Sequence, residues 1–402
     1  EKVARMLRSK GIDALPYHAG LKNEEREKIQ DKFMAGEIPV IAATIAFGMG
    51  IDKRDIRRII HYNLPKSLES YSQEIGRAGR DGQPSLCETL ADRDSISILE
   101  NFVYGDTPEE AGVKIALEAI RANQGNLWEV KLRTLSTESD IRQLPLKTLL
   151  VYLELEKIIK PRYTYFQDYE FKFITGQDEI IARLKEFRKE ISEFAGVIFK
   201  HIFTKKIWST VDIDAVVKEQ SAPRERVIKA LEYFGEQGWI ELRSKIAIDV
   251  YEIMNHDFDI ETLSAKLLTV FEKKETTEIE RIHKMVAFFA GKSCLSAALS
   301  GYFGELGIKN CGRCSVCKTG PVVIPPGEQR EPLTSYNYNE LAKEFTSAIS
   351  EELSPATIAK FFCGISSPLL TRNKAKKIRN FGILEDYPFK EVKKWVHKQG
   401  DF

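Results

Sequence analysis

No stretch of this sequence is apolar over the roughly 20 residues that a membrane-spanning helix needs. The charged start EKVARMLRSKG has the pattern of a helix and lacks the apolar core of a signal peptide. Six cysteines in 402 residues are too few for a disulfide scaffold, which favours a reducing compartment. The 60 basic and 59 acidic residues leave a net charge of +1, so any surface for a polyanion must come from local clustering. We therefore expect an intracellular globular protein with no membrane partner.

The first hundred residues alternate between short apolar segments and amphipathic segments. A length of 402 residues predicts roughly two or three domains, and this alternation marks the first of them. Strands that alternate with helices form a parallel sheet covered on both faces, and ligands bind at the carboxyl ends of such strands. The expected strands are 12–17, 39–43, 57–62 and 86–91, and the expected helices are 3–10, 23–35 and 68–77.

Residues 106–275 have a different pattern, in which helices are followed by alternating apolar and polar residues. Segment 157–174 is rich in aromatic residues and is expected to form a hairpin, as is WIELRSKIAIDVYEI at 239–253. Helices are expected at 212–219 and 224–237, joined by a turn at Ser-Ala-Pro. Helix, turn, helix and hairpin is the plan of a winged helix, and the alternative is another small α+β domain.

Residues 44–82 carry polar side chains that the edge of the expected sheet would bring to a ligand. Glycines that follow a strand, such as Gly50, let backbone N–H groups approach a phosphate. Asp52 can accept a hydrogen bond from a ribose hydroxyl. Arg77 and Arg80 share a face if a helix extends that far, which suits charge on a transferred phosphoryl group. The alternative is a solvated basic end of a helix.

Four cysteines have the spacing of a metal site. They are Cys294, Cys311, Cys314 and Cys317. Their pattern, C-x16-C-x2-C-x2-C, offers four thiolates to a tetrahedral Zn²⁺ ion, and four unrelated buried cysteines are the alternative. We place Cys294 on the preceding helix, so that the metal would join this helix to a tight turn around Gly312. Cys87 and Cys363 lie in apolar stretches and are interpreted as core residues.

Three segments resemble, in order and at the right separation, the motifs of one helicase family. They are YHAGL at 17–21, AATIAFGMGIDK at 42–53 and QEIGRAGRDG at 73–82. They resemble the second RecA-like motor domain of RecQ-family DNA helicases, over residues 1–105. The segment CLSAALSGYFGE…CGRCSVC resembles the zinc module of the same family. The resemblance implies an ATP-dependent 3′–5′ DNA helicase of repair and recombination that binds Zn²⁺ and uses ATP with Mg²⁺.

The resemblance also implies roles for single residues. The nucleotide-facing positions are Asp52, Gln73, Arg77 and Arg80. Of these, the two arginines match the motif that reaches the γ-phosphate, the aspartate matches the ribose-facing position, and the glutamine lies in the same cleft. Thr44 matches a residue that holds the DNA backbone, and His18 lies in a motif that faces DNA.

Two motifs that ATP hydrolysis requires are missing from the sequence. There is no G-x-x-x-x-G-K-[ST] loop and no Asp-Glu-x-His run. In the family, both belong to the first RecA-like domain, which we expect to precede residue 1 and to supply the Mg²⁺ ligands. The chain alone is therefore expected to be inactive. The alternative is a catalytically inactive zinc and winged-helix DNA-binding protein, against which the intact arginines argue.

The expected fold is an α/β RecA-like parallel-sheet domain, two α+β winged-helix-like domains, a small helical zinc-binding domain and a helical tail. The boundaries are 1–105, 106–178, 179–275 and 276–320, then a linker at 321–334 and the tail at 335–402. In the common RecQ layout the zinc module follows the motor domain directly, so this order resembles a divergent branch. In a bacterium the family would place the protein in the cytoplasm, at the nucleoid.

Single-stranded and forked duplex DNA are the partners that the resemblance implies, and two basic clusters could contact them. Arg224, Arg226 and Lys229 open the helix that a winged helix would offer to a groove. From Thr371 to Arg379, five of nine residues are basic and none is acidic. For each cluster the alternative is an ordinary solvated face.

The aromatic segment 157–174 suggests a further DNA contact. Tyr165 and Phe166 are expected at or near the turn of its hairpin. Aromatic rings stack on bases without regard to sequence, so a hairpin tip could hold a DNA fork open. The alternative is that these rings are packed or merely exposed.

Overall fold

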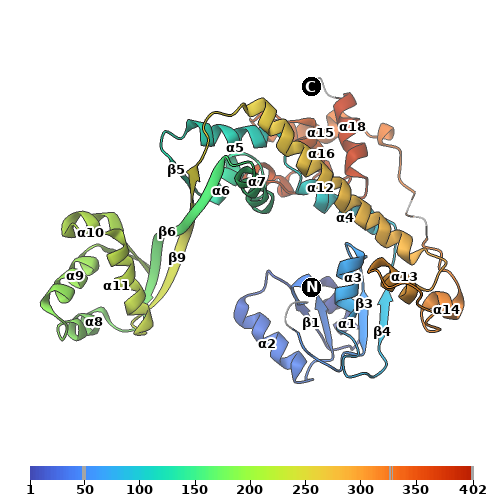
Figure 1. Ribbon diagram of the computed structural model, residues 1–402, viewed down its shortest axis with the longest axis horizontal. Coiled ribbons are helices and arrows are strands. Elements are labelled where there is room, and N and C mark those ends of the chain that lie inside the picture. The colour runs from blue at the N-terminus through green and yellow to red at the C-terminus, as the bar shows by residue number, and fades with distance from the viewer. Residues whose placement is uncertain (48–50, 326, 328, 400–402) are drawn as a thin grey trace. The chain divides into compact units, whose positions relative to one another are not determined.

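The computed structural model describes residues 1–47, 51–325, 327 and 329–399 (Figure 1). This part of the chain forms two compact units, each assembled from separated segments. The first unit comprises Glu1–Tyr104, Lys273–Ile365 and Asn380–Phe402, and the second comprises Gly105–Glu272 and Ser366–Arg379. Within the described ranges, no helix combines the length and the apolar character that crossing a bilayer requires.

The first unit opens with strands and helices in alternation. Its elements are α1 (Lys2–Ser9), β1 (Ala14–Tyr17), α2 (Asn23–Met34), β2 (Val40–Ala43), η1 (Ile45–Phe47), β3 (Arg58–His61), α3 (Leu68–Ile75), β4 (Leu86–Thr89) and α4 (Asp94–Gly105). β1 pairs with β2 and β3 pairs with β4, in both cases in parallel. The predicted parallel α/β architecture of this region is therefore confirmed.

The parallel strands form two pairs that are not hydrogen-bonded to each other in the described part of the chain. Ile60 on β3 is 56% exposed and Leu86 on β4 is 46% exposed, so one face of this pair is open to solvent. The expectation of a sheet covered on both faces is wrong for this pair. Alternation along the sequence predicts the direction of the strands, but it does not determine which surfaces meet.

Helices make up the rest of the first unit. They are the second part of α12 (Ile260–Phe289), α13 (Leu295–Tyr302), α14 (Ser315–Thr319), η2 (Leu333–Ser335), α15 (Tyr338–Ala348), α16 (Pro355–Phe362) and α18 (Phe389–Gln399). Ser354 caps α16 by accepting a hydrogen bond from the N–H of Thr357, and Pro355 occupies the first turn. The buried rings of Phe345 and Phe361 stack with centroids 4.0 Å apart, so α15 packs on α16.

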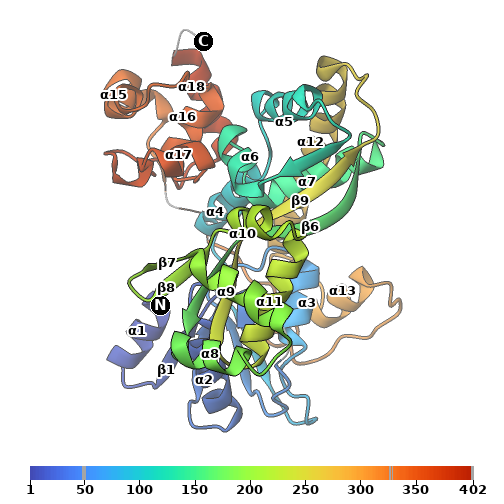
Figure 2. The same ribbon diagram turned by 90° about the vertical axis from the view of Figure 1, so that its left-hand side faces the viewer.

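The second unit is built around one antiparallel sheet with the strand order β5-β9-β6-β8-β7. Its elements are α5 (Glu110–Ala122), β5 (Leu127–Val130), α6 (Leu132–Glu138), α7 (Gln143–Leu155), β6 (Ile159–Phe173), α8 (Gln177–Leu184), α9 (Lys189–Lys200), β7 (Ile202–Lys205), β8 (Trp208–Val211), α10 (Ile213–Gln220), α11 (Arg224–Glu236), β9 (Ile240–Ile253), the first part of α12, α17 (Pro368–Arg372) and η3 (Ala375–Lys377). Figure 1 shows β6 and β9 as a long ribbon between two groups of helices, and Figure 2 shows the same ribbon after a quarter turn.

The structure corrects both hairpin predictions. Residues 159–173 form the single strand β6, and 240–253 form the single strand β9, which pair with each other. Tyr165 and Phe166 lie within this ladder, opposite Ile248 and Ala247, and not at a turn. Period-2 alternation identifies a strand, but it cannot show that its partner lies about eighty residues away. The proposal of a strand-separating hairpin tip loses its structural basis.

The helices predicted at 212–219 and 224–237 form, as α10 and α11. The hairpin that should follow α11 does not, because β9 pairs with β6 instead. The expected boundary between 178 and 179 falls inside α8. One hydrophobic core contains Ile159 and Ile253, and a second contains Phe171 and Ile240, at the other end of the ribbon. Along the chain, the residues of the second core therefore lie between residues of the first core. The prediction of two successive domains with a boundary after residue 178 is wrong for this reason.

Candidate nucleotide site and metal centre

Arg77 and Arg80 lie on a tight turn that follows α3. The helix begins at the N-cap Ser67, whose hydroxyl accepts a hydrogen bond from the N–H of Ser70, and it ends at Ile75. Arg77 and Arg80 therefore do not share a helix face, because α3 ends before both of them. We call residues 76–82 the arginine loop. It is fixed against the segment before β3 by bonds from the N–H of Gly79 to the carbonyl of Ile56 (3.0 Å) and from Asp81 to Arg54 (3.3 Å).

Gly79 is required by the shape of the arginine loop. Its φ of +64° lies in the left-handed region, where residues with a Cβ are strained. A Cβ at this position would lie 2.8 Å from the carbonyl oxygen of Gln83 and 2.8 Å from Oγ of Ser85. The loop is also held by an ion pair between Arg57 and Asp81, which lowers the pKa of the Asp81 carboxyl. The two arginines are thus presented by a constrained backbone.

Both arginines reach the segment that contains Asp52. Nη1 of Arg80 lies 2.8 Å from Oδ1 of Asp52, and Nη1 of Arg77 lies 3.5 Å from the carbonyl oxygen of Ile51. Nε of Arg77 is buried and has no hydrogen-bond partner among the described residues. Three of the four predicted nucleotide-facing residues, Asp52, Arg77 and Arg80, are therefore neighbours. Gly50, which we also assigned to this site, lies outside the described residues.

The remaining candidates of this unit lie on two elements. Gln73 is exposed on the last turn of α3, directly before the arginine loop. His18 and Thr44 directly follow β1 and β2, whose ends Tyr17 and Ala43 are paired in register. Both residues therefore lie at the carboxyl edge of one strand pair, where parallel sheets bind ligands. Nε2 of His18 lies 3.0 Å from the carboxylate of Glu1, and the side chain of Thr44 is exposed.

Sequence reasoning missed the residues that hold α3 in place. The ring of Tyr71 contacts those of Phe288 and Phe289, at centroid distances of 5.8 and 5.2 Å, so the end of α12 packs on α3. His61 on β3 lies 2.7 Å from the carboxylate of Glu74. No local pattern marks these residues, because their partners are distant in sequence.

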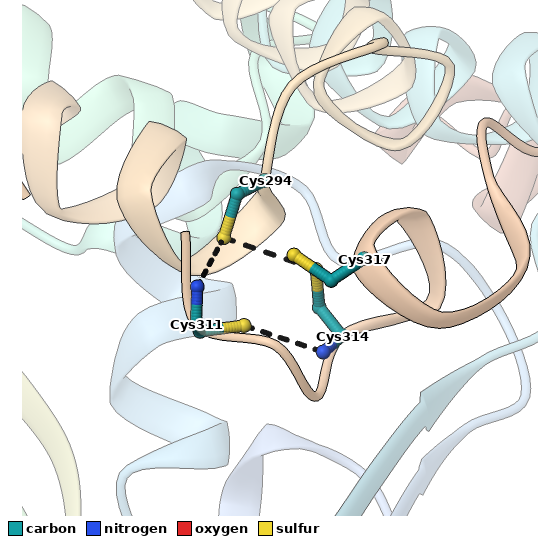
Figure 3. Close-up of side chains that lie close together, drawn as sticks. All are labelled: Cys294, Cys311, Cys314 and Cys317. Atoms are coloured by element: carbon teal, nitrogen blue, oxygen red, sulfur yellow. Dashed lines mark hydrogen bonds between the residues drawn. The ribbon is translucent and has the colours of Figure 1, made fainter. Parts of the chain in front are cut away.

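The four predicted metal ligands come together, as Figure 3 shows. Their Sγ atoms all lie within 4.8 Å of one another, and those of Cys294 and Cys314 are 3.9 Å apart. Four sulfurs at about 2.3 Å from a tetrahedral zinc ion would be about 3.8 Å apart, so the site fits Zn²⁺. Cys294 is the N-cap of α13, the helix that precedes the turn, which agrees with its expected position at this helix. Gly312, with a φ of +68°, makes the predicted turn.

Hydrogen bonds around Cys311 favour the thiolate form that binds zinc, whereas the neighbouring Cys314 raises the pKa of Cys317 to about 12. The N–H of Cys311 donates to Sγ of Cys294 (3.2 Å), and the N–H of Cys314 donates to Sγ of Cys311 (3.3 Å). The hydroxyl of Ser296, followed by the N–H of Arg313, lowers the pKa of Cys311 to about 5. Cys363 is buried, as predicted, whereas Cys87 is only half-buried.

The DNA-contact candidates of the second unit differ in their surroundings. Arg224 pairs with Asp214 (3.1 Å) and donates to the carbonyl oxygen of Phe166 (3.4 Å). The guanidinium of Arg226 lies 4.4 Å from the centroid of the Phe194 ring. An open pocket of about 980 Å³ beside these residues is lined by Glu129, Asp168, Glu170, Asp212, Asp214 and Glu225, with Arg224 and Lys245 as its cations. The site around Arg224 is therefore acidic, whereas Lys229 is exposed on α11.

Two family models match parts of the chain. Residues 1–82 match the helicase conserved C-terminal domain, and residues 257–318 match the RecQ zinc-binding family. The first range contains the arginine loop and Asp52, and the second contains all four cysteines. The zinc match begins before our expected boundary at 276, since it includes the whole of α12.

Several helicases are similar to this chain. ATP-dependent DNA helicase Q-like 5 of Arabidopsis thaliana is 27% identical over 71% of this chain and 31% of its own length. ATP-dependent DNA helicase Q5 of Rattus norvegicus is 46% identical over 28% of this chain and 12% of its own length. RecQ-like DNA helicase blm-1 of Caenorhabditis elegans is 52% identical over 27% of this chain and 11% of its own length. The chain thus spans less than a third of the length of these relatives. The chain is therefore similar to DNA helicases over residues 1–82, and to the RecQ zinc-binding family over residues 257–318.

Proposed function

We propose that the chain is the second motor lobe and the DNA-binding part of an ATP-dependent helicase that moves 3′ to 5′ along DNA. The observation that carries this proposal is the convergence of Arg77, Arg80 and Asp52 at one site in the region that matches a helicase domain. Repair and recombination are the processes in which we expect it to act. The resemblance noted from the sequence supports both parts of the proposal.

The two arginines would stabilise the charge that develops on the transferred phosphoryl group. Their backbone is constrained by the bonds of the arginine loop, so positive charge is supplied with little reorganisation. Asp52 is 72% exposed at its side chain, and such exposed ion pairs contribute about 1 kcal/mol or less. Arg80 can therefore exchange Asp52 for a phosphate at low cost, which frees the carboxylate for a ribose hydroxyl.

This chain does not supply the rest of the ATP site. Its sequence has no Walker loop and no Asp-Glu-x-His run. We propose that the first RecA-like domain of the same protein binds the phosphates and Mg²⁺ and that ATP lies between the two lobes. The 402-residue chain alone would then bind DNA without hydrolysing ATP.

Zn²⁺ would have a structural role in this protein. Four thiolates leave no open coordination position for a substrate, so the bound metal would serve only to hold its ligands together. Cys294, between α12 and α13, and Cys317, on α14, would be joined through it. His18 and Thr44 are proposed to contact the DNA backbone, and Arg226, Lys229, Tyr165 and Phe166 remain proposed contacts of the second unit, with Arg224 the least accessible to phosphate.

The experiment is a comparison of ATP hydrolysis and strand separation by the protein that includes its first motor domain. We expect ATPase activity that single-stranded DNA stimulates, and unwinding of a duplex with a 3′ tail but not of one with a 5′ tail. Unwinding only of the 5′-tailed duplex would refute the polarity. DNA binding without any ATPase activity would support the alternative, a zinc-containing DNA-binding protein with an inactive motor lobe.

A further inference from the structure

The segment Ser366–Arg379, which we call the basic strap, belongs to the second unit although its neighbours on both sides belong to the first. It contains Arg372, Lys374, Lys376, Lys377 and Arg379 and no acidic residue. In a chain with a net charge of +1, this is a local concentration of positive charge. The strap lies outside both family matches.

The backbone of the strap is anchored to α6 and to the turn after it. Nε of Arg142 donates to the carbonyl oxygen of Ser366 (2.8 Å), and the N–H of Leu369 donates to Oδ1 of Asp140 (2.5 Å). Arg372 donates to the carbonyl oxygen of Thr137 (3.2 Å). The strap is therefore held at three points and is not a loose tail.

Successive turns hold the strap in one conformation between these anchors and its end. Ser367 caps α17 through the N–H of Leu370 (3.3 Å), and the N–H of Lys377 donates to the carbonyl oxygen of Lys374 (2.8 Å). Leu370 and Ala375 are buried at 2% and 1% exposure. The apolar side chains of the strap thus point into the unit, and its basic side chains are left on the outside.

Among the residues that the structure describes, the charges at the end of the strap have no acidic partner. Lys374, Lys376, Lys377 and Arg379 are exposed, and none of them forms an ion pair within the described part of the chain. Elsewhere in the same unit, exposed lysines do pair, as Lys200 does with Glu219. Four like charges within six residues on a fixed backbone repel one another, so an anionic ligand that neutralises them gains binding free energy.

We propose that the basic strap is a binding site for the phosphodiester backbone of DNA. Lysine and arginine side chains that contact phosphates release condensed counterions, which gives affinity without reading the base sequence. A fixed backbone lowers the entropy that binding costs, because only the side chains have to be ordered. The inference rests on the proposed function, in that it assumes DNA as the partner, and it adds a contact site at the opposite end of the sequence from the motor motifs.

The test compares two double variants of the full 402-residue chain. Lys376→Gln with Lys377→Gln removes two charges from the strap. Lys205→Gln with Lys206→Gln is the matched control, because it removes two exposed charges from the β7–β8 turn of the same unit. The affinity for a fluorescently labelled duplex and for a labelled single strand is measured as a function of salt concentration. Zinc content and circular dichroism verify that both variants are folded.

We expect the strap variant to bind duplex on the order of tenfold more weakly at low salt, while the control binds like the wild type. The plot of log affinity against log salt should become less steep, by about 1.8 in slope for duplex and about 1.4 for single strands. If the slope is unchanged in the strap variant while the wild-type chain binds DNA, the proposal for the strap is refuted and the proposed function is not. Equal losses in both variants would show a non-specific charge effect and would also overturn it. Absence of DNA binding by the wild-type chain would refute the proposed function itself.

Discussion

The hydroxyl of Tyr302 donates a 2.6 Å hydrogen bond to the carboxylate of Glu69. Tyr302 ends α13, the helix that Cys294 caps, and Glu69 lies in the first turn of α3. This bond, followed by backbone N–H donation, lowers the pKa of Glu69 to about 2. The helix that leads into the arginine loop is therefore tied to the zinc-binding segment by a specific polar contact, in addition to the aromatic packing from α12.

The first prediction concerns this contact. In Tyr302→Phe we expect the pKa of Glu69 to rise towards its ordinary value of 4.5 and the free energy of unfolding at pH 7 to fall by about 1 kcal/mol. A depressed carboxylate pKa stabilises the fold above pH 4.5, and this contribution is lost as the pH falls towards 2. The stability difference between variant and wild type should therefore shrink over that range, as measured by denaturant unfolding at a series of pH values. The exposed Tyr62→Phe is the control, and a difference independent of pH would contradict the prediction.

The second prediction concerns the arginines. In a protein that includes the proposed first motor domain, Arg77→Ala and Arg80→Ala should each lower DNA-stimulated ATP turnover on the order of a thousandfold, because the charge on the transferred phosphoryl group loses its partner. ATP binding should weaken less, since most nucleotide contacts are proposed to lie on the other lobe. Arg58→Ala removes an exposed arginine of β3 in the same unit and should leave turnover unchanged. Near-normal turnover in both loop variants would refute their assignment.

The third prediction concerns the shape of the arginine loop. Gly79→Ala places a Cβ 2.8 Å from the oxygens of Gln83 and Ser85, so the loop must shift. Gly82→Ala has a similarly positive φ of +79° but meets no atom within 4 Å, so it tests backbone strain alone. We expect ATP turnover to fall by tenfold or more in Gly79→Ala, because a misalignment that raises the activation free energy by about 1.4 kcal/mol lowers the rate tenfold. In Gly82→Ala it should change less. Equal effects of the two substitutions would show that the close contact is unimportant.

The fourth prediction concerns the metal. Protein purified without chelator should contain one Zn²⁺ per chain, which thiol modification releases. Cys314→Ser should lose the metal and unfold at a lower temperature, because structural zinc contributes roughly 10 kcal/mol or more to folding. Cys87→Ser should keep its zinc, since Cys87 lies on β4, outside the cluster. Wild-type protein without metal, or full zinc occupancy in Cys314→Ser, would contradict this assignment.

Motifs whose residues are close in sequence could be predicted. Cys311, Cys314 and Cys317 lie within seven residues, so their spacing already places three thiolates around one point. The alternation of strands and helices in the first hundred residues predicted β1 to β4 closely, because short apolar runs between helical segments indicate strands. Asp52, Arg77 and Arg80 were likewise proposed from motifs, and in the structure they lie close together.

Contacts between distant segments could not be predicted. The pairing of β6 with β9 joins residues about eighty positions apart, and no turn residue marks it, so each strand was interpreted as a hairpin of its own. Arg142 and Ser366 are 224 residues apart, and nothing in either segment indicates that the basic strap docks on the second unit. Tyr302 and Glu69, 233 residues apart, were missed for the same reason.

By itself, the sequence determined the chemical groups of this protein: four thiolates with metal spacing, two arginines beside a glycine, and a run of lysines without acids. These follow from residue types and short-range spacing, which the chain carries whatever its fold. The tertiary structure alone decided that α3 ends before Arg77, that Arg80 lies against Asp52, and that the strap is anchored with its charges outward. Such outcomes depend on which surfaces bury each other, and that choice is made by packing over the whole unit and not by any local pattern.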